Sequence, residues 1–319
     1  MKEAELCFPQ FLNDSCRIPE TPNFSFWCLY IVLFFLCLVT TALNMLVILS
    51  ISHFRQLHTP TNILLLSLAV SDLLVGILVM PFEIILKETC WILGDFMCVL
   101  YFLVPITIIS SSVGNMVLIS IDRYVAICDP LHYPRKVTLR RASLCVSVSW
   151  GSAALYSVIL LHENLMEPGR YISCRGECFI NISGTVDLVV SFIVPIWVIV
   201  VLYVRVFVVA VSQARAVKHQ TKRLKTVKAK KSEMKAAITL GILVVVFLLC
   251  YSPYYCVSLS GHEILIGSYS EVFMIFLMYF NSCLNPVIYA LFYPWFRKAM
   301  RLILTGQMLR PGSREVRVL

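Results

Sequence analysis

Charged residues are scarce in this chain. Only 14% of its 319 residues are Asp, Glu, Lys or Arg, whereas 59% are hydrophobic, and the mean hydropathy is +0.83. An ordinary soluble domain has about 25% charged and about 45–50% apolar residues. So little charge excludes intrinsic disorder, collagen, a coiled coil and a small disulfide-rich secreted domain, and it indicates that lipid covers much of the protein. The net charge of +9 is compatible with a nucleic-acid-binding protein, so the positions of the charges along the chain have to decide.

Long stretches of the chain lack every charged residue or contain a single acid. A membrane-spanning helix needs about 20 predominantly apolar residues. By this criterion the sequence predicts an all-α membrane protein with a bundle of seven transmembrane helices. We expect them near residues 26–50, 60–86, 95–127, 142–161, 187–211, 235–259 and 269–293.

The placement of basic residues predicts the orientation. Of 27 Lys and Arg residues, 22 fall on one side of the predicted membrane and five on the other. The positive-inside rule then puts the N-terminus outside and the C-terminus in the cytoplasm. We expect an extracellular segment at 1–25, a transmembrane domain at 26–293, an amphipathic helix at 294–305 and a cytoplasmic tail at 306–319. The basic loop at 214–235 fits membrane topology, anionic lipid or an intracellular protein partner better than nucleic acid.

Cysteines and glycosylation sequons are consistent with this orientation. The predicted outer segments contain six cysteines, which suggest disulfides in any of 15 pairings. These are Cys7, Cys16, Cys90, Cys98, Cys174 and Cys178. Three Asn-X-Ser sequons also lie outside, at Asn13, Asn23 and Asn181. Asn13 is the best glycosylation candidate, because the other two lie close to helix starts.

A buried acid in the second span points to an ion or water site. Asp72 lies mid-helix, where a charge is costly and marks function by default. Oxygen and amide groups on other spans could surround it, and such ligands suit a sodium ion or a water network. A purely structural hydrogen-bond hub is an equal alternative. The candidate ligands for an allosteric sodium ion are Asp72, Ser112, Asn281, Ser282 and Asn285, with Asn44 nearby.

Several motifs on successive spans resemble those of rhodopsin-like (class A) G protein-coupled receptors. They are Asn44, Asp72, Asp122-Arg123-Tyr124, Trp150, Pro195, Cys250-Tyr251-Ser252-Pro253 and Asn285-Pro286-Val287-Ile288-Tyr289. Within that class, the segments 54–62 and 129–133 look aminergic. The segments 281–285 and 292–299 resemble the trace amine-associated receptors, many of which are olfactory in vertebrates.

This resemblance implies a function as well as a fold. It implies a plasma-membrane receptor that binds a small volatile or trace amine and activates a heterotrimeric G protein by an outward movement of helix 6. A stimulatory or olfactory G protein that raises cyclic AMP, and expression in olfactory sensory neurons, would follow. The resemblance also implies the disulfide Cys98–Cys178, with Cys7–Cys174 and Cys16–Cys90 tethering the N-terminus.

The chain departs from the family at the usual amine anchor. Aminergic receptors carry an Asp in helix 3 seven residues after the loop cysteine, and here that residue is Pro105. Asp187 in helix 5 is the expected replacement, with Ser191 one turn below it. A helix-capping role is the alternative for Asp187. The other expected ligand-binding residues are Tyr254, Tyr255, Tyr279, Tyr251, Ile106, Ile109 and Ile180.

Two details of that pocket stay open. The tyrosines could form a cation–π wall or could simply be packing residues. Glu83 and Glu271 could hold a second ammonium, or they could be solvated charges at the rim.

The resemblance also assigns the switch. Arg123 would pair with Asp122 and reach Glu233 in the resting state, with Tyr124 completing the motif. Phe247, Pro253, Asn285, Pro286, Tyr203 and Tyr289 would rearrange on activation.

Other functions have less support. A transporter or channel would need inverted repeats or an ionisable pore, and neither is visible. A light receptor needs a lysine in helix 7, but the sequence has no Lys between Lys235 and Lys298. No enzyme motif and no cofactor site is recognisable. A receptor of the same fold for a non-amine ligand remains the live alternative because of Pro105.

Overall fold

The helices follow the predicted spans in order. The computed structural model describes residues 6–11, 13–17, 24–86, 89–219, 224–259 and 269–318. Within them, six helical segments are long and apolar enough to cross a membrane, and a further helix has a shorter apolar segment, Gly241–Val257. The long helices are α1 (Phe24–His53), α2 (Pro60–Leu74) with α3 (Met80–Leu86), α4 (Asp95–Cys128), α6 (Leu139–Leu160), α9 (Val194–His219), α10 (Leu224–Leu259) and α11 (Tyr269–Phe292). The expected seven-helix membrane bundle is confirmed.

Two wide helical turns occur just before prolines. The π-helical turn η2 (Val75–Val79) joins α2 to α3 ahead of Pro81, and η3 (Leu188–Ile193) joins the short α8 (Gly184–Asp187) to α9 ahead of Pro195. A proline cannot donate a hydrogen bond to the carbonyl four residues back, and a π turn accommodates that loss. Asp187 is therefore the last residue before a distorted turn, in which side-chain directions differ from those of a regular helix.

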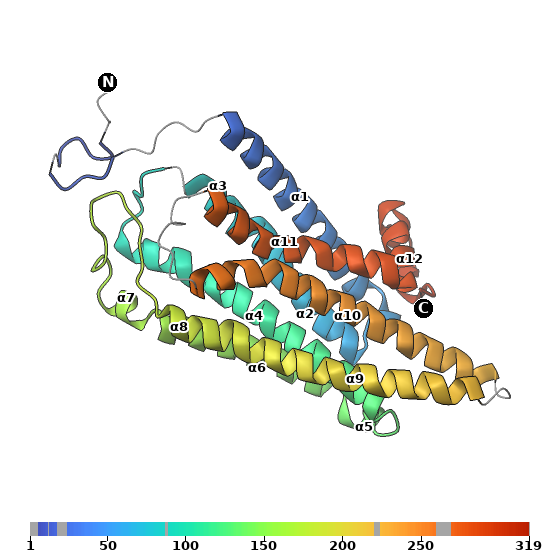
Figure 1. Cartoon of the computed structure of the whole chain (residues 1–319). Helices are drawn as coiled ribbons and strands as arrows, with labels where there is room; N and C mark the ends of the chain where they lie inside the picture. Colours follow the sequence, from blue (N-terminus) through green and yellow to red (C-terminus); the bar gives the residue numbers. More distant parts are fainter. Residues whose placement is uncertain are drawn as a thin grey trace.

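The basic segment 214–235 is mostly helical, so the prediction of a loop there is wrong. α9 continues to His219 and α10 begins at Leu224. Ala, Lys, Arg and Gln, which dominate this segment, are strong helix formers, and this explains the extension beyond the apolar stretches. In Figure 1, α9 and α10 project together past the rest of the bundle at the end where α5 (Tyr133–Lys136) lies.

Large apolar side chains on the outside of the bundle face the space that lipid would occupy. Phe34 on α1 and Trp197 on α9 are 56% and 67% exposed, respectively. Polar side chains are instead buried between helices. The indole of Trp150 donates to the Ser67 hydroxyl at 3.0 Å, and that hydroxyl donates to Asn115 at 2.9 Å. This chain of bonds joins α6, α2 and α4.

The end of the chain packs near the C-terminal end of α1. After α11, the expected amphipathic helix forms as α12 (Pro294–Leu304), with Trp295, Phe296 and Ala299 buried. The segment that follows returns to the turn after α1, η1 (Arg55–Leu57), where the backbone N–H of Val318 donates to Gln56 at 3.2 Å. Figure 1 shows α12 and the last described residues together, at the opposite end of the molecule from the described N-terminal segment 6–17.

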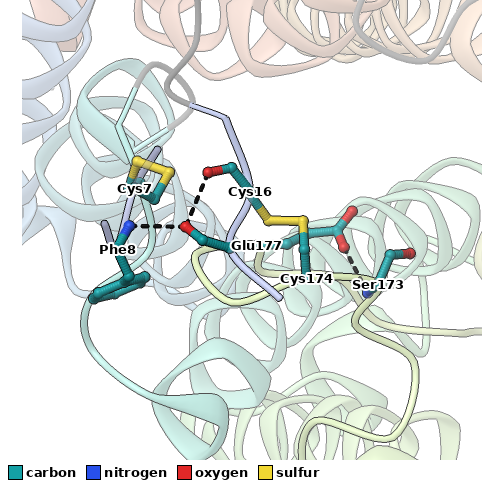
Figure 2. The surroundings of a disulfide bond; sticks show 8 residues. Cys7, Phe8, Cys16, Ser173, Cys174 and Glu177 are labelled. Atoms are coloured by element: carbon teal, nitrogen blue, oxygen red, sulfur yellow. Dashed lines mark hydrogen bonds between the residues drawn. A yellow bond between two sulfur atoms is a disulfide. The ribbon is translucent and has the colours of Figure 1, made fainter. Parts of the chain in front are cut away.

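Three disulfides lie at one end of the bundle, and two of the expected pairings are wrong. Cys98–Cys178 forms as expected, but Cys7 pairs with Cys90 and Cys16 pairs with Cys174. The reason is backbone register, because the amide of Cys16 donates to the carbonyl of Arg175 at 3.0 Å. That bond places Cys16 beside Cys174. Figure 2 shows this disulfide, with Cys7 nearby.

Candidate ligand-binding and signalling site

A cavity of about 890 Å³ lies at the end of the bundle that carries the disulfides. Residues of α3, α4, α8, α10 and α11 line it, together with the loop around Cys178 and the disulfide-bonded N-terminal segment. This volume falls within the usual range for small-molecule sites, about 300–1,000 Å³. The lining is largely apolar and aromatic, with acidic groups at separate points.

Asp187 is one of these acidic groups, and its carboxylate is held from two helices. Its Oδ1 accepts 2.8 Å hydrogen bonds from the hydroxyls of Tyr156 on α6 and Ser191 on η3. The Ser191 hydroxyl also lies 3.0 Å from the Tyr156 hydroxyl. The Asp187 side chain is therefore anchored by side chains and does not cap a helix. Among the described residues no cation pairs with this carboxylate, and both hydrogen bonds go to Oδ1.

Most of the expected ligand-binding residues share this cavity with Asp187. They are Ser191, Tyr254, Tyr255, Tyr279, Ile106, Ile109 and Ile180. Tyr251 differs, because it is buried below the cavity against Phe247, with ring centroids 4.3 Å apart. Pro105 also lines the cavity, so the position of the usual helix 3 acid faces the ligand space without a charge.

A second acid lines the cavity on α3. Glu83 accepts a 2.9 Å hydrogen bond from the Tyr101 hydroxyl of α4. The side chain of Glu271, the other acid considered for this role, lies outside the described residues.

The Asp72 cluster forms below the cavity. Asp72, Asn281 and Asn285 are fully buried, and the Asn285 amide donates to Asp72 Oδ2 at 2.8 Å. Several buried polar atoms here have no hydrogen-bond partner within the described part of the chain. They are Asn44 Oδ1, Asp72 Oδ1, Asn281 Nδ2 and Oδ1, Asn285 Oδ1 and Tyr289 Oη. With Ser112 and Ser282 also buried at this depth, the oxygen-rich set fits a sodium ion or ordered water.

The Asp122-Arg123-Tyr124 motif near the C-terminal end of α4 forms a closed hydrogen-bonded cluster. Arg123 donates through Nε to Asp122 Oδ2 at 2.9 Å and through Nη2 to both Asp122 and Thr61. Thr61 on α2 donates to Asp122 Oδ2 at 2.9 Å, and Tyr133 on α5 donates to Oδ1 at 2.8 Å. Burial raises the pKa of the Tyr133 hydroxyl, which keeps its proton available for this bond.

Residues between the cavity and the Asp122–Arg123 cluster are packed tightly. Phe247, Tyr289 and Tyr251 are buried, and the Tyr203 hydroxyl lies against Gly241 of α10. Pro253 lies inside α10 and Pro286 inside α11. Tyr124 is partly buried and packs beside Ile127 and Val206 at the α4–α9 contact. The side chain of Glu233 falls outside the described residues, so its expected bond to Arg123 stays a prediction.

The sequence assigned no role to four participants, Tyr156, Tyr101, Thr61 and Tyr133, although Thr61 and Tyr133 lie in the two segments that look aminergic. Each acts through a hydrogen bond to an acid on another helix, with sequence separations of 31, 18, 61 and 11 residues. For Tyr156 and Tyr101, the signal in the sequence is a tyrosine within a predicted apolar span.

Comparison with known proteins agrees with these features. The sequence profile of the 7 transmembrane receptor (rhodopsin family) matches residues 43–289. Trace amine-associated receptor 13c of Danio rerio is 38% identical, covering 98% of this chain and 96% of the relative. Trace amine-associated receptor 6 of Homo sapiens is 37% identical, with 97% and 94% covered, and trace amine-associated receptor 4 of Mus musculus is 35% identical, with 98% and 94% covered.

Proposed function

The chain belongs to the rhodopsin family of seven-transmembrane receptors and, within it, to the trace amine-associated receptors, and from this we propose that it binds a small amine whose ammonium group pairs with Asp187. Members of this family are receptors and not enzymes. They are multi-pass proteins of the plasma membrane, and their partners are a small-molecule ligand and a heterotrimeric G protein.

The observation that carries the amine proposal is how the Asp187 carboxylate is hydrogen-bonded and that it lines the cavity. Tyr156 and Ser191 donate to Oδ1, and Asp187 lines the cavity without forming an ion pair among the described residues. An uncompensated carboxylate in a largely apolar cavity attracts a cation, because pairing offsets part of its lost hydration. Tyr254 and Tyr255 could add cation–π attraction worth about 0.5–2 kcal/mol.

A physical route connects this acid to the signalling end. Phe192, in the π turn after Asp187, stacks on Tyr255 of α10 with ring centroids 4.4 Å apart. One helix turn closer to the cytoplasm, Tyr251 packs on Phe247. We propose that an ammonium drawing Asp187 inward shifts this stack, so that α10 swings away from the Asp122–Arg123 cluster. A bias of a few kcal/mol between the two states suffices.

The finer assignments follow the same proposal. The N-terminus at 1–25 is extracellular with Asn13 glycosylated, the transmembrane domain is 26–293, and α12 with the tail is cytoplasmic. The G protein is of the stimulatory or olfactory type and raises cyclic AMP in olfactory sensory neurons. A sodium ion bound by Asp72, Ser112, Asn281, Ser282 and Asn285 would neutralise the buried carboxylate and favour the resting state.

The test is a cyclic-AMP assay of the wild type and Asp187→Ala against primary, tertiary and di-amines. We expect Asp187→Ala to abolish amine responses while surface expression persists. Asp95→Asn, which removes an acid at the outer end of α4 that does not line the main cavity, is the matched control. An unchanged dose–response curve for Asp187→Ala would refute the assignment. Silence of the wild type throughout would favour a non-amine ligand.

A further inference from the structure

The segment after α12 folds back onto the turn that follows α1. It contains two short 3₁₀ turns, η5 (Gln307–Leu309) and η6 (Ser313–Glu315). Gly306 and Gly312 precede these turns with φ of +69° and +80°, a left-handed conformation that glycine adopts without steric cost. The two turns bring the chain back to η1, and we call residues 307–318 the tail strap.

Two buried side chains anchor the tail strap. Ser313 is 7% exposed and Val318 is 3% exposed, and Val318 belongs to the main buried apolar cluster of the bundle. The other described residues of the strap are exposed or partly exposed, and Leu309 reaches 86%. Burial at two points of an otherwise exposed segment indicates a specific docking contact.

The side chain of Gln56 in η1 holds the backbone of the strap with both ends of its amide. Its Nε2 donates to the carbonyl of Glu315 at 3.3 Å, and its Oε1 accepts from the N–H of Val318 at 3.2 Å. One turn earlier, His53 Nε2 lies 3.0 Å from Ser313 Oγ. The docking therefore depends on Gln56 and on the two buried anchors more than on the exposed side chains of the strap.

The turn η1 is linked by hydrogen bonds to the Asp122–Arg123 cluster. The carbonyl of Leu57, the last residue of η1, accepts from Asn62 Nδ2 at 2.8 Å, and both residues are buried. Thr61, the neighbour of Asn62, donates to Asp122 at 2.9 Å and accepts from Arg123. The position of the Thr61 hydroxyl at the start of α2 therefore depends on where η1 is held.

We infer that the tail strap is an autoinhibitory segment: docked on η1 through Gln56 and Val318, it stabilises the resting arrangement of the Asp122–Arg123 cluster, and its release raises ligand-independent G protein activation. The inference goes beyond the amine proposal, because it involves no ligand. It rests on the cluster being closed in the resting state. The strap shifts the equilibrium only by the difference in its docking free energy between the two states.

The first experiment measures whether the strap is docked. Ser313→Cys places a thiol at a buried anchor, and Leu309→Cys places one at an exposed position of the same strap. In solubilised receptor, a water-soluble maleimide should label Ser313→Cys about 10-fold or more slowly than Leu309→Cys, after subtraction of wild-type labelling. Gln56→Met removes both amide hydrogen bonds but keeps the length of the side chain, so it should bring the two rates together. Equal rates without Gln56→Met, or rates unchanged by it, would overturn the inference.

The second experiment measures G protein activation without ligand, normalised to receptor at the cell surface. Val318→Asp puts an acid at the apolar anchor, and Leu309→Asp adds the same charge at an exposed position. We expect Val318→Asp and Gln56→Met each to raise the basal signal about 3-fold or more, and Leu309→Asp to leave it unchanged. Because the strap is inferred to act through Thr61, Gln56→Met combined with Thr61→Val should give less than the product of the two single increases.

Four results of the second experiment would contradict the inference. An unchanged basal signal in both Val318→Asp and Gln56→Met would show that the strap does not hold the resting state. An equal increase in Leu309→Asp would assign the effect to charge and not to docking. Increases that multiply in the double variant would show that the strap acts independently of the cluster. No effect of Thr61→Val alone would remove the premise, and the amine assignment of Asp187 would be untouched.

Discussion

Breaking one hydrogen bond in the Asp122–Arg123 cluster should raise ligand-independent signalling. Tyr133→Phe removes the 2.8 Å donor to Asp122 Oδ1 and changes little else in side-chain volume. Asp122 is only 3% exposed, so water cannot readily replace the lost donor. A hydrogen bond to a charged group contributes about 1.5–3 kcal/mol. If activation opens this cluster, the small fraction of receptor that is active without ligand should increase. The lower end of that energy range corresponds to an increase of about 10-fold.

The assay is G protein activation without ligand, normalised to receptor at the cell surface. Thr61→Val is a second variant, because it removes the 2.9 Å donor to the other carboxylate oxygen without changing the shape of the side chain. Ser147→Ala, which deletes a hydroxyl on the exposed side of α6, is the control. Unchanged or reduced basal activity in both cluster variants would show that these bonds do not stabilise the resting state.

Three further predictions test other parts of the structure. Since Cys16 and Cys174 form one disulfide, the double Ser variant should reach the cell surface as well as either single variant does; a much worse double variant would contradict the pairing. A Cβ on Gly241 would lie 2.5 Å from the Tyr203 hydroxyl, so Gly241→Ala should lower the free energy of unfolding by about 1–3 kcal/mol, measured by thermal unfolding of the solubilised receptor. Adding Tyr203→Ala should remove this clash and restore part of the lost stability. An unshifted melting midpoint would refute that contact. Pro105→Asp should not by itself create strong amine binding, because Pro105 shapes this part of α4; a large gain in potency would contradict this.

Composition and charge predicted the helices well because the membrane imposes a simple rule. A span must be long, apolar and helical, so its limits can be recognised from the sequence without knowledge of its neighbours. The basic segment after α9 shows the limit of the rule. Its charges end the membrane span, but its helix-forming residues continue the helix to His219.

The site was only partly predictable, because its details depend on contacts between distant segments. Asp187 could be singled out as an acid in an apolar span. Its anchoring by Tyr156 depends on how α6 and α8 meet, and sequence spacing does not encode this. The pairing of Cys16 with Cys174 likewise follows from a backbone bond between the N-terminal segment and the outer loop. Six equivalent cysteines allow many pairings until that register is known.

The most direct test of the amine assignment removes only the charge of Asp187. Asp187→Asn keeps an oxygen that accepts from Tyr156 and Ser191, so the local geometry should persist. Truncating a desolvated charge pair costs about 2–5 kcal/mol, so the concentration of the best amine needed for half-maximal activation should rise about 30-fold or more at equal surface expression. An unchanged concentration in Asp187→Asn would contradict the central claim that this carboxylate binds the ammonium group.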